Sequence, residues 1–283
     1  MLEKTIHHLL RLACLLPMLL AVSVQATEPG ATGQPLTGFE LKDFRGKLHR
    51  MEDFADSGFL VVAFLGTECP LAKLYSPRLV ELHDNYQSRG VAFVAISSNV
   101  QDSITELAAY ARIHNIGFPV LKDLGNRVAD ELGAVRTPEV FVLDQERKIR
   151  YRGRVDDQYG IGYIRDEPQR NDMAEALDEL LSGKQVTVPA TEAVGCHIGR
   201  VREPKVDAEV TYTNRIAGIL QERCVECHRA GDIGPFALDD YDEVVGWAEM
   251  IEEVVREERM PPWHAHPDFG RFSNDRRMSD EEK

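Results

Sequence analysis

Hydrophobic and polar positions follow two alternating periods along most of the chain. Short apolar runs bounded by turn residues are typical of buried strands, and apolar positions three or four residues apart are typical of helices. The predicted strands are 58–66, 91–96, 118–121, 140–143 and 148–155, and the predicted helices are 74–86, 103–114, 127–132 and 173–181. Strands alternating with helices, followed by a hairpin and a last helix, predict a three-layer α/β sandwich over residues 37–183.

The pattern changes on both sides of this unit. Residues 27–36 are rich in Gly, Pro and Thr and are expected to form a flexible leader. Residues 184–210 have no sustained period, which predicts a linker or a lid. From residue 211 the sequence becomes helical, with a long acidic helix expected over 240–258. Residues 211–283 therefore predict a second, small all-α domain.

The first 26 residues have the pattern of an export signal. Lys4 and Arg11 lie near the start, an apolar run follows over 12–24, and small residues precede position 27. The apolar run is short for a bilayer span, although an uncleaved membrane anchor is the alternative. No later segment is long and apolar enough to cross a membrane. We therefore expect a periplasmic or otherwise exported protein, where disulfides and covalent haem can form.

Charge and length narrow the function classes. The chain has 283 residues, enough for two modest domains, and a formal net charge of −14. A strongly acidic chain without a basic stripe argues against a nucleic-acid partner. Five cysteines are too few for a disulfide-dense scaffold, so their positions carry the information.

The strongest motif is Cys224-Val225-Glu226-Cys227-His228. C-x-x-C-H is the attachment signature of c-type haem: Cys224 and Cys227 can bond the two vinyl groups, and His228 then lies under the iron. The motif predicts one covalent haem c. A redox disulfide or half of a zinc site, completed by His264 and His266, are the alternatives.

The sixth iron ligand is expected to be Met260, in the segment Arg259-Met260-Pro261-Pro262-Trp263. A thioether after a helix and before a stiff Pro-Pro turn suits a low-spin haem, and His264 and His266 are the rival ligands. The carbonyl of Pro235 is a candidate acceptor for the ring N–H of His228.

A second motif, Thr67-Glu68-Cys69-Pro70, joins a predicted buried strand to a predicted helix. A cysteine at a helix N-terminus meets unpaired N–H groups and the positive end of the helix dipole. Both stabilise a thiolate, so Cys69 is predicted to be a reactive thiol rather than an inert buried cysteine.

On these residues the segment 37–183 resembles the thioredoxin-like superfamily, in its alkyl hydroperoxide reductase/thiol-specific antioxidant (redoxin) branch. Cys69 falls where that family has the first cysteine of its C-x-x-C motif, and Pro138 where it keeps a cis-proline beside the thiol. The second cysteine is replaced by Ala72, so a dithiol cycle within the motif is impossible. The threonine that peroxiredoxins keep three residues before their cysteine is also missing, because Gly66 is there.

On the C-x-x-C-H motif and the segment RMPPWH, residues 211–283 resemble a class I cytochrome c domain of the kind fused to redoxin domains in bacteria. The resemblance implies electron transfer. Ser279 and Glu282 form a capping box, the signature of a helix start, one residue before the chain ends. We expect the sequence to be a fragment whose cytochrome-like domain is truncated at its C-terminus.

The functional hypothesis is an exported redox protein that combines a monothiol thioredoxin-like domain with a c-type haem. Its partner is expected to be a redox protein or a small thiol or peroxide substrate. Cys196, in the predicted linker, is a candidate to resolve an oxidised Cys69, and its neighbour His197 is expected to be solvated. The alternatives are a haem electron-transfer module with a vestigial redoxin scaffold, and a haem-coupled monothiol peroxidase.

Overall fold

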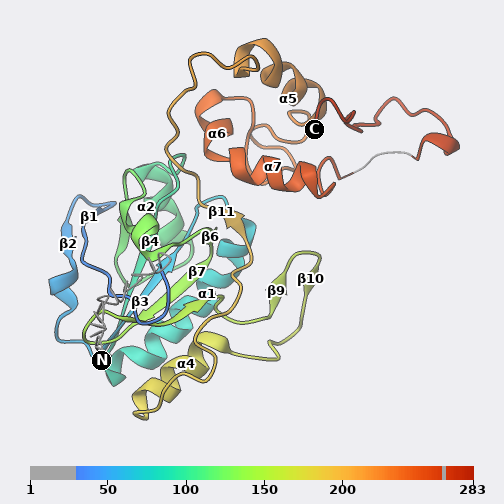
Figure 1. Cartoon of the computed structure of the whole chain (residues 1–283). Helices are drawn as coiled ribbons and strands as arrows, with labels where there is room; N and C mark the ends of the chain where they lie inside the picture. The colour runs from blue at the N-terminus through green and yellow to red at the C-terminus, as the bar shows by residue number, and fades with distance from the viewer. Residues whose placement is uncertain (1–29, 263–265) are drawn as a thin grey trace, which may run out of the picture.

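The computed structural model describes residues 30–262 and 266–283 and is built around a seven-stranded mixed sheet (Figure 1). The strand order is β2-β1-β5-β4-β3-β7-β8, in which β3, β4 and β5 are parallel to one another and the outer pairs are antiparallel. The strands are β1 (Glu40–Asp43), β2 (Leu48–Arg50), β3 (Phe59–Phe64), β4 (Val91–Ser97), β5 (Val120–Lys122), β7 (Glu139–Leu143) and β8 (Ile149–Gly153). Each strand predicted from the sequence is present.

Helices cover both faces of the sheet. The helices of this unit are α1 (Pro70–Tyr86), α2 (Ile104–Ile113), α3 (Arg127–Leu132) and α4 (Asp172–Leu181). Because side chains alternate along a strand, Val61 and Ala63 of β3 pack in the core beneath α1, α2 and α4. Leu60 and Val62 pack in the opposite core, with α3. The predicted three-layer thioredoxin-like arrangement is confirmed.

The N-terminal end of the described chain packs on this unit. Gly33 N donates to Ile149 O at 2.7 Å, and Leu36 N donates to Arg147 O at 3.0 Å. Leu36 is 2% exposed and belongs to the second core. The expectation of a flexible leader is therefore wrong for residues 30–36, because burial of Leu36 and pairing with β8 fix the segment. The predicted signal peptide, 1–26, and residues 27–29 lie outside the described residues.

The prediction of a linker over residues 184–210 is also wrong for residues 196–198. Residues 196–197 form strand β11 (Cys196–His197), which pairs antiparallel with β6 (Arg136–Thr137). Ile198, the next residue, is 1% exposed in the core shared with α3. Burial of Ile198 and pairing with β6 hold this segment on the α/β unit.

The C-terminal part is helical, as predicted. Its helices are α5 (Ala217–Arg223), α6 (Tyr241–Gly246) and α7 (Ala248–Arg256). The expected single helix over 240–258 is interrupted at Trp247. Trp247 is 1% exposed and stacks on Phe236, with ring centroids 3.9 Å apart, which favours a bend at this point. No helix in the described ranges is long and apolar enough to cross a membrane.

The two parts meet near β11. In Figure 1 the α6–α7 pair lies above the end of the sheet where β6 and β11 run, and α7 contacts β11. Leu220, Val244 and Trp247 of the C-terminal part belong to the same apolar cluster as Cys69. The C-terminal part therefore packs against the region around Cys69.

Candidate functional site

Cys69 lies at the start of α1, as predicted. It is the residue before the first helical position, Pro70, and Lys73 N donates to its carbonyl at 3.0 Å. The side chain has no solvent exposure. As a neutral thiol it donates to Thr137 O, with the sulfur 2.9 Å from that oxygen. Pro138 follows Thr137 through a cis peptide bond, which confirms the expected cis-proline beside the thiol.

Cys196 lies against Cys69. Strand pairing sets Cys196 opposite Thr137, and the thiol and backbone N–H of Cys196 donate hydrogen bonds to the Cys69 sulfur. The preceding residue, Gly195, has φ +156° and packs on the Thr137 carbonyl so closely that no Cβ would fit. Cys196, the candidate resolving cysteine, therefore lies beside Cys69. A strand and not a flexible linker brings it there.

Hydrogen bonding shifts the pKa values of the two thiols in opposite directions. Burial alone would raise the pKa of Cys69, but hydrogen bonds from Cys196 and from the backbone of Ala72 lower it below its ordinary value. The pKa of Cys196 is raised, first by its hydrogen bond to Cys69 and then by burial. At neutral pH the arrangement thus favours a thiolate on Cys69 beside a neutral thiol on Cys196.

A buried carboxylate supports the loop before Cys69. Asp102 is 3% exposed and accepts four hydrogen bonds, at 2.8 to 3.2 Å, from Thr67 (N and Oγ1), Ser97 and Asn99. Sequence analysis did not identify Asp102. The sequence feature that could have indicated Asp102 is the polar run that follows the apolar strand at 91–96. Polar side chains next to a buried strand are expected to be hydrogen-bonded to one another where they are buried.

A carboxylate from the C-terminal part reaches the two strands beside the cysteines. Glu253 of α7 accepts from Arg136 of β6 and from His197 of β11, each at 2.7 Å. Arg136 also donates to Gly195 O at 2.8 Å. The expectation that His197 is solvated is wrong, because the ring is paired with Glu253 at the contact between the two parts.

The C-x-x-C-H motif follows α5. Cys227 N and His228 N both donate to Cys224 O, at 3.1 and 3.0 Å, so the motif forms one compact turn. Cys227 is exposed, and burial raises the pKa of the half-buried Cys224 to about 11. The motif thus presents one thiol to solvent and one to the apolar cluster.

The ring of His228 is fixed from one side. Its Nδ1 lies 3.0 Å from Phe236 O, so the acceptor is Phe236 and not Pro235 as expected. Gly234 packs against this ring, and a Cβ there would lie 2.8 Å from Nδ1. A hydrogen bond at Nδ1 sets the tautomer and leaves Nε2 available as a ligand atom, which is how ligating histidines are usually held.

The candidates for the sixth iron ligand, Met260, His264 and His266, have fewer described contacts than His228. Met260 follows α7, donates its N–H to Val254 O at 3.0 Å and has a side chain 36% exposed. His266 is exposed, and His264 lies outside the described residues. The part of the chain that the structure describes contains no group of three or more His, Cys, Asp or Glu placed to hold a metal ion.

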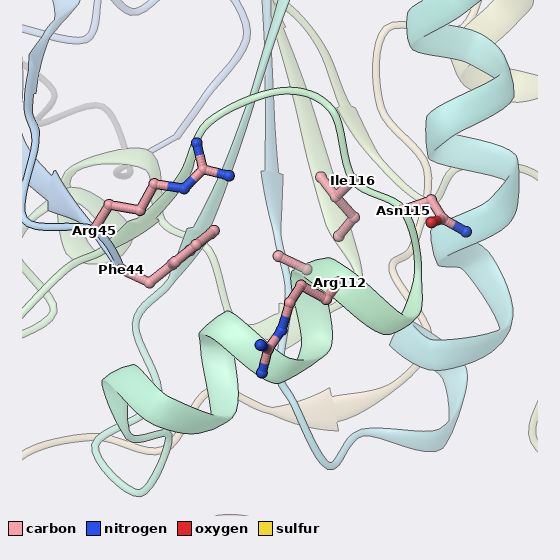
Figure 2. A pocket seen from close by; sticks show the side chains of 6 residues that line it. Phe44, Arg45, Arg112, Asn115 and Ile116 are labelled. Atoms are coloured by element: carbon pink, nitrogen blue, oxygen red, sulfur yellow. The ribbon is translucent and has the colours of Figure 1, made fainter.

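A separate pocket of about 260 Å³ lies at the C-terminal end of α2 (Figure 2). It is lined by Phe44, Arg45, Ala111, Arg112, Asn115 and Ile116. None of the residues predicted from the sequence lines it, and it holds no nucleophile. This pocket is therefore separate from Cys69, Cys196 and the C-x-x-C-H turn.

Comparison with known proteins shows what the α/β unit is similar to. The AhpC/TSA family model matches residues 32–152, less than half of the chain. Thiol-disulfide oxidoreductase ResA of Geobacillus thermodenitrificans is 28% identical over 120 residues, which cover 42% of this chain and 67% of that protein. The protein of the same name from Bacillus thuringiensis is 26% identical over 117 residues, covering 41% and 66%. The chain thus spans about two thirds of the length of these curated relatives.

Two solved structures extend the match. A hypothetical protein from Sinorhizobium meliloti is 31% identical with a TM-score of 0.55, covering 63% of this chain and 98% of that one. An uncharacterized conserved protein from Geobacillus kaustophilus is 30% identical with a TM-score of 0.57, covering 62% and 95%. Both likenesses cover a larger share of the chain than the family model does.

Proposed function

Because the chain carries a redoxin domain of the AhpC/TSA family, we propose that it is a thiol–disulfide oxidoreductase whose redox pair is Cys69 and Cys196. The observation that carries the proposal is the pairing of β11 with β6, which holds the Cys196 thiol in hydrogen-bond contact with the Cys69 sulfur. The name shared by the curated relatives, thiol-disulfide oxidoreductase, describes the same chemistry. The second cysteine of the pair comes from a distant segment, which replaces the one absent at Ala72.

The chemistry follows from the two protonation states. The Cys69 thiolate attacks one sulfur of a substrate disulfide, forms a mixed disulfide and releases the other substrate sulfur as a thiolate, which takes a proton from solvent. Cys196 then loses its proton and attacks the Cys69 sulfur, which forms the Cys69–Cys196 disulfide and releases the second substrate thiol. The substrate disulfide is reduced by two electrons and the protein dithiol is oxidised by two, and the same steps run in reverse.

The test is direct mapping of the disulfide. Reduced protein is equilibrated with oxidised glutathione, quenched in acid, alkylated and digested. We expect a cross-linked peptide containing Cys69 and Cys196 in the wild type. Cys196→Ser should instead accumulate glutathione on Cys69, because the resolving thiol is gone. A wild-type protein in which Cys196 stays alkylatable under all oxidising conditions contradicts the proposal, and unchanged thiol turnover in Cys69→Ser favours the vestigial-scaffold alternative.

A second function is favoured by the geometry of His228. We propose that Cys224 and Cys227 attach one haem c, that His228 would ligate its iron and that Met260 would be the second protein ligand. The hydrogen bond from His228 Nδ1 to Phe236 O, and the space kept by Gly234 beside the ring, support this assignment. Bound haem would supply one-electron transfer, and the residues named here hold and orient it.

The haem assignment is tested by extraction. A covalent haem stays with the protein in acidic acetone and then gives a pyridine-haemochrome spectrum of the c type. Loss of all colour to the acetone phase contradicts the assignment, and a Cys227→Ala variant provides the matched loss of one thioether.

We also propose that the protein acts outside the cytoplasm. Covalent haem attachment and stable disulfides both belong to that environment, and the pattern of residues 1–26 matches an export signal. Fractionation of cells that express the full chain, followed by N-terminal sequencing, is the test. A protein that stays in the cytoplasm with an intact N-terminus contradicts this proposal.

A further inference from the structure

The contact between α7 and the β6–β11 pair joins three polar side chains on three elements. Glu253 comes from α7, Arg136 from β6 and His197 from β11, and Arg136 and His197 are opposite each other in the strand register. This pair is the next one along the strands from Thr137 and Cys196. The carboxylate therefore bridges the two strands one residue away from the redox pair.

We propose that Glu253 is a positioning residue for Cys196: it clamps β11 onto β6 and so keeps the Cys196 thiol at the Cys69 sulfur. The inference rests on the proposed function of the Cys69–Cys196 pair and deepens it. Glu253 acts through its hydrogen bonds with His197 and Arg136, and its charge also contributes to raising the pKa of Cys196.

The two strands are short, and the contact with Glu253 adds to other bonds that hold them, such as the one from Ile198 N to Val135 O at 2.9 Å. Each is two residues long, and short isolated strand pairs have marginal stability of their own. Arg136 links α7 to the backbone beside Cys196, since its guanidinium donates to Glu253 at 2.7 Å and to Gly195 O at 2.8 Å. Charge-assisted hydrogen bonds of this kind are stronger than neutral ones. Glu253 thus stabilises the backbone on both sides of Cys196.

The environment of Glu253 suits a fixed ionic contact. Its side chain is 14% exposed, and those of Arg136 and His197 are 22% and 18% exposed. Burial would raise its pKa, but the hydrogen bonds and charges of Arg136 and His197 outweigh that and lower it to about 2. Arg259 also pairs with the carboxylate. The Glu253–Arg136 pair is therefore ionised across the physiological range and only weakly screened by salt.

The clamp links the two parts of the protein. The clamp exists only while α7 is seated on β11, because Glu253 belongs to α7. Trp247, at the start of α7, stacks on Phe236, whose carbonyl holds His228. A shift of α7 would therefore remove the clamp and change the placement of Cys196, while both cysteines stay chemically unchanged.

The experiment compares Glu253→Gln with Glu252→Gln in the full chain. Glutamine keeps the size of the side chain and removes its charge. Glu252 is the matched control because it lies on the same helix, is exposed and pairs only with Arg256 one turn away among the described contacts. Each protein is equilibrated in glutathione buffers of graded ratio, quenched in acid, and the Cys69–Cys196 disulfide is quantified by peptide mapping.

We expect Glu253→Gln to need roughly tenfold more oxidising buffer than the wild type to reach half disulfide, since neighbouring groups in one network couple by such factors. Glu252→Gln should match the wild type. In the reduced protein the pH profile of Cys69 alkylation should move to higher pH in Glu253→Gln, because the Cys196 donor is less well placed, and stay unchanged in Glu252→Gln.

The outcomes separate the two proposals. Equal midpoints and equal pH profiles in wild type and Glu253→Gln, with the disulfide formed in both, overturn the clamp and leave the redox pair intact. No Cys69–Cys196 disulfide in the wild type overturns the redox pair itself. If Glu253→Gln does not fold, His197→Gln removes one arm of the clamp and keeps the Arg136–Glu253 pair; a smaller shift in the same direction supports the clamp, and no shift overturns it.

Discussion

Cys196 lies directly opposite Thr137 in the antiparallel β6–β11 pair, and this register brings its thiol to the sulfur of Cys69. The carbonyl of Thr137 is 2.9 Å from that same sulfur. One backbone pairing therefore fixes both the acceptor for the neutral Cys69 thiol and the donors for its thiolate. The redox pair is created by strand register and not by the spacing of a local motif.

The first prediction concerns the Cys196 donor. Cys196→Ala removes a hydrogen bond to the Cys69 thiolate, so the charged form loses stability and the pKa of Cys69 rises by about one pH unit. Cys196→Ser keeps a hydroxyl donor and should stay close to the wild type. The pH dependence of Cys69 alkylation, followed by mass spectrometry of its peptide, measures both. Identical profiles for the Ala and Ser variants would show that the side-chain donor has no role.

The sequence predicts the α/β unit well because its signals are local. The continuous apolar run at 58–66 and the helical spacing at 74–86 are read from neighbouring residues, and the structure has β3 and α1 there. Cys69 lies at a strand-to-helix junction for the same reason. Its thiolate-favouring position follows from two adjacent elements and needs no knowledge of the rest of the chain.

The position of Cys196 was not predictable in this way. A two-residue strand has no periodicity, so residues 184–210 had the pattern of a linker. The partner of β11 lies about 60 residues earlier, and Glu253 is 117 residues from Arg136 in the sequence. Long-range contacts of this kind leave no local pattern. Gly195 is the one local trace, because its φ of +156° and its close approach to Thr137 exclude a side chain.

The sequence predicts a helix over 240–258 whose apolar stripe is Val244, Trp247, Ile251, Val254 and Val255. Of these residues, Val244, Trp247 and Val255 are buried. The interruption at Trp247 was missed because its neighbours are distant in the sequence: Trp247 stacks on Phe236, and the preceding Gly246 lies close to Gln101. Amphipathic spacing thus predicts the buried face of a helix better than its continuity.

The second prediction concerns the buried carboxylate. Asp102→Ala removes the acceptor of four hydrogen bonds and leaves buried donors of Thr67, Ser97 and Asn99 unpaired. Since each unpaired buried donor is costly, we expect the free energy of unfolding to fall by about 3 kcal/mol or more. Urea unfolding measures the change. Asp56→Ala, at an exposed position of the same domain, should change stability by less than about 0.5 kcal/mol, and equal losses in both variants would contradict the role of Asp102.

The third prediction concerns packing beside His228. Gly234→Ala places a Cβ 2.8 Å from His228 Nδ1 and 2.7 Å from Cys227 O, so the ring or the motif turn must move. If His228 is a haem ligand, the variant should lose part of the low-spin absorption spectrum of the wild type. Gly218→Ala is the control, because its Cβ would meet open space. Spectra that are identical in all three proteins would show that the geometry around Gly234 does not matter to the haem.

The last prediction uses Glu68, which precedes the reactive cysteine. Partial burial, followed by repulsion from Glu243 and Glu106, raises its pKa from 4.5 to about 7. A carboxyl group whose folded-state pKa is raised stabilises the protein below its unfolded pKa, and that contribution is lost as the pH rises through the folded pKa. The wild type should therefore lose stability between pH 4.5 and about 8 on account of this residue.

Glu68→Gln cannot ionise and should remove this loss. We expect the variant to be more stable than the wild type by about 1 kcal/mol at pH 8.5 and to match it near pH 4.5, after allowance for solvent screening at a half-buried site. Urea unfolding at the two pH values gives the comparison. Glu81→Gln, an exposed position on α1, should show no such pH-dependent gain, because its carboxyl group is 61% exposed. A gain of equal size at both pH values would mean that the effect of Glu68 is not ionisation, since repulsion from Glu243 and Glu106 requires the charged form.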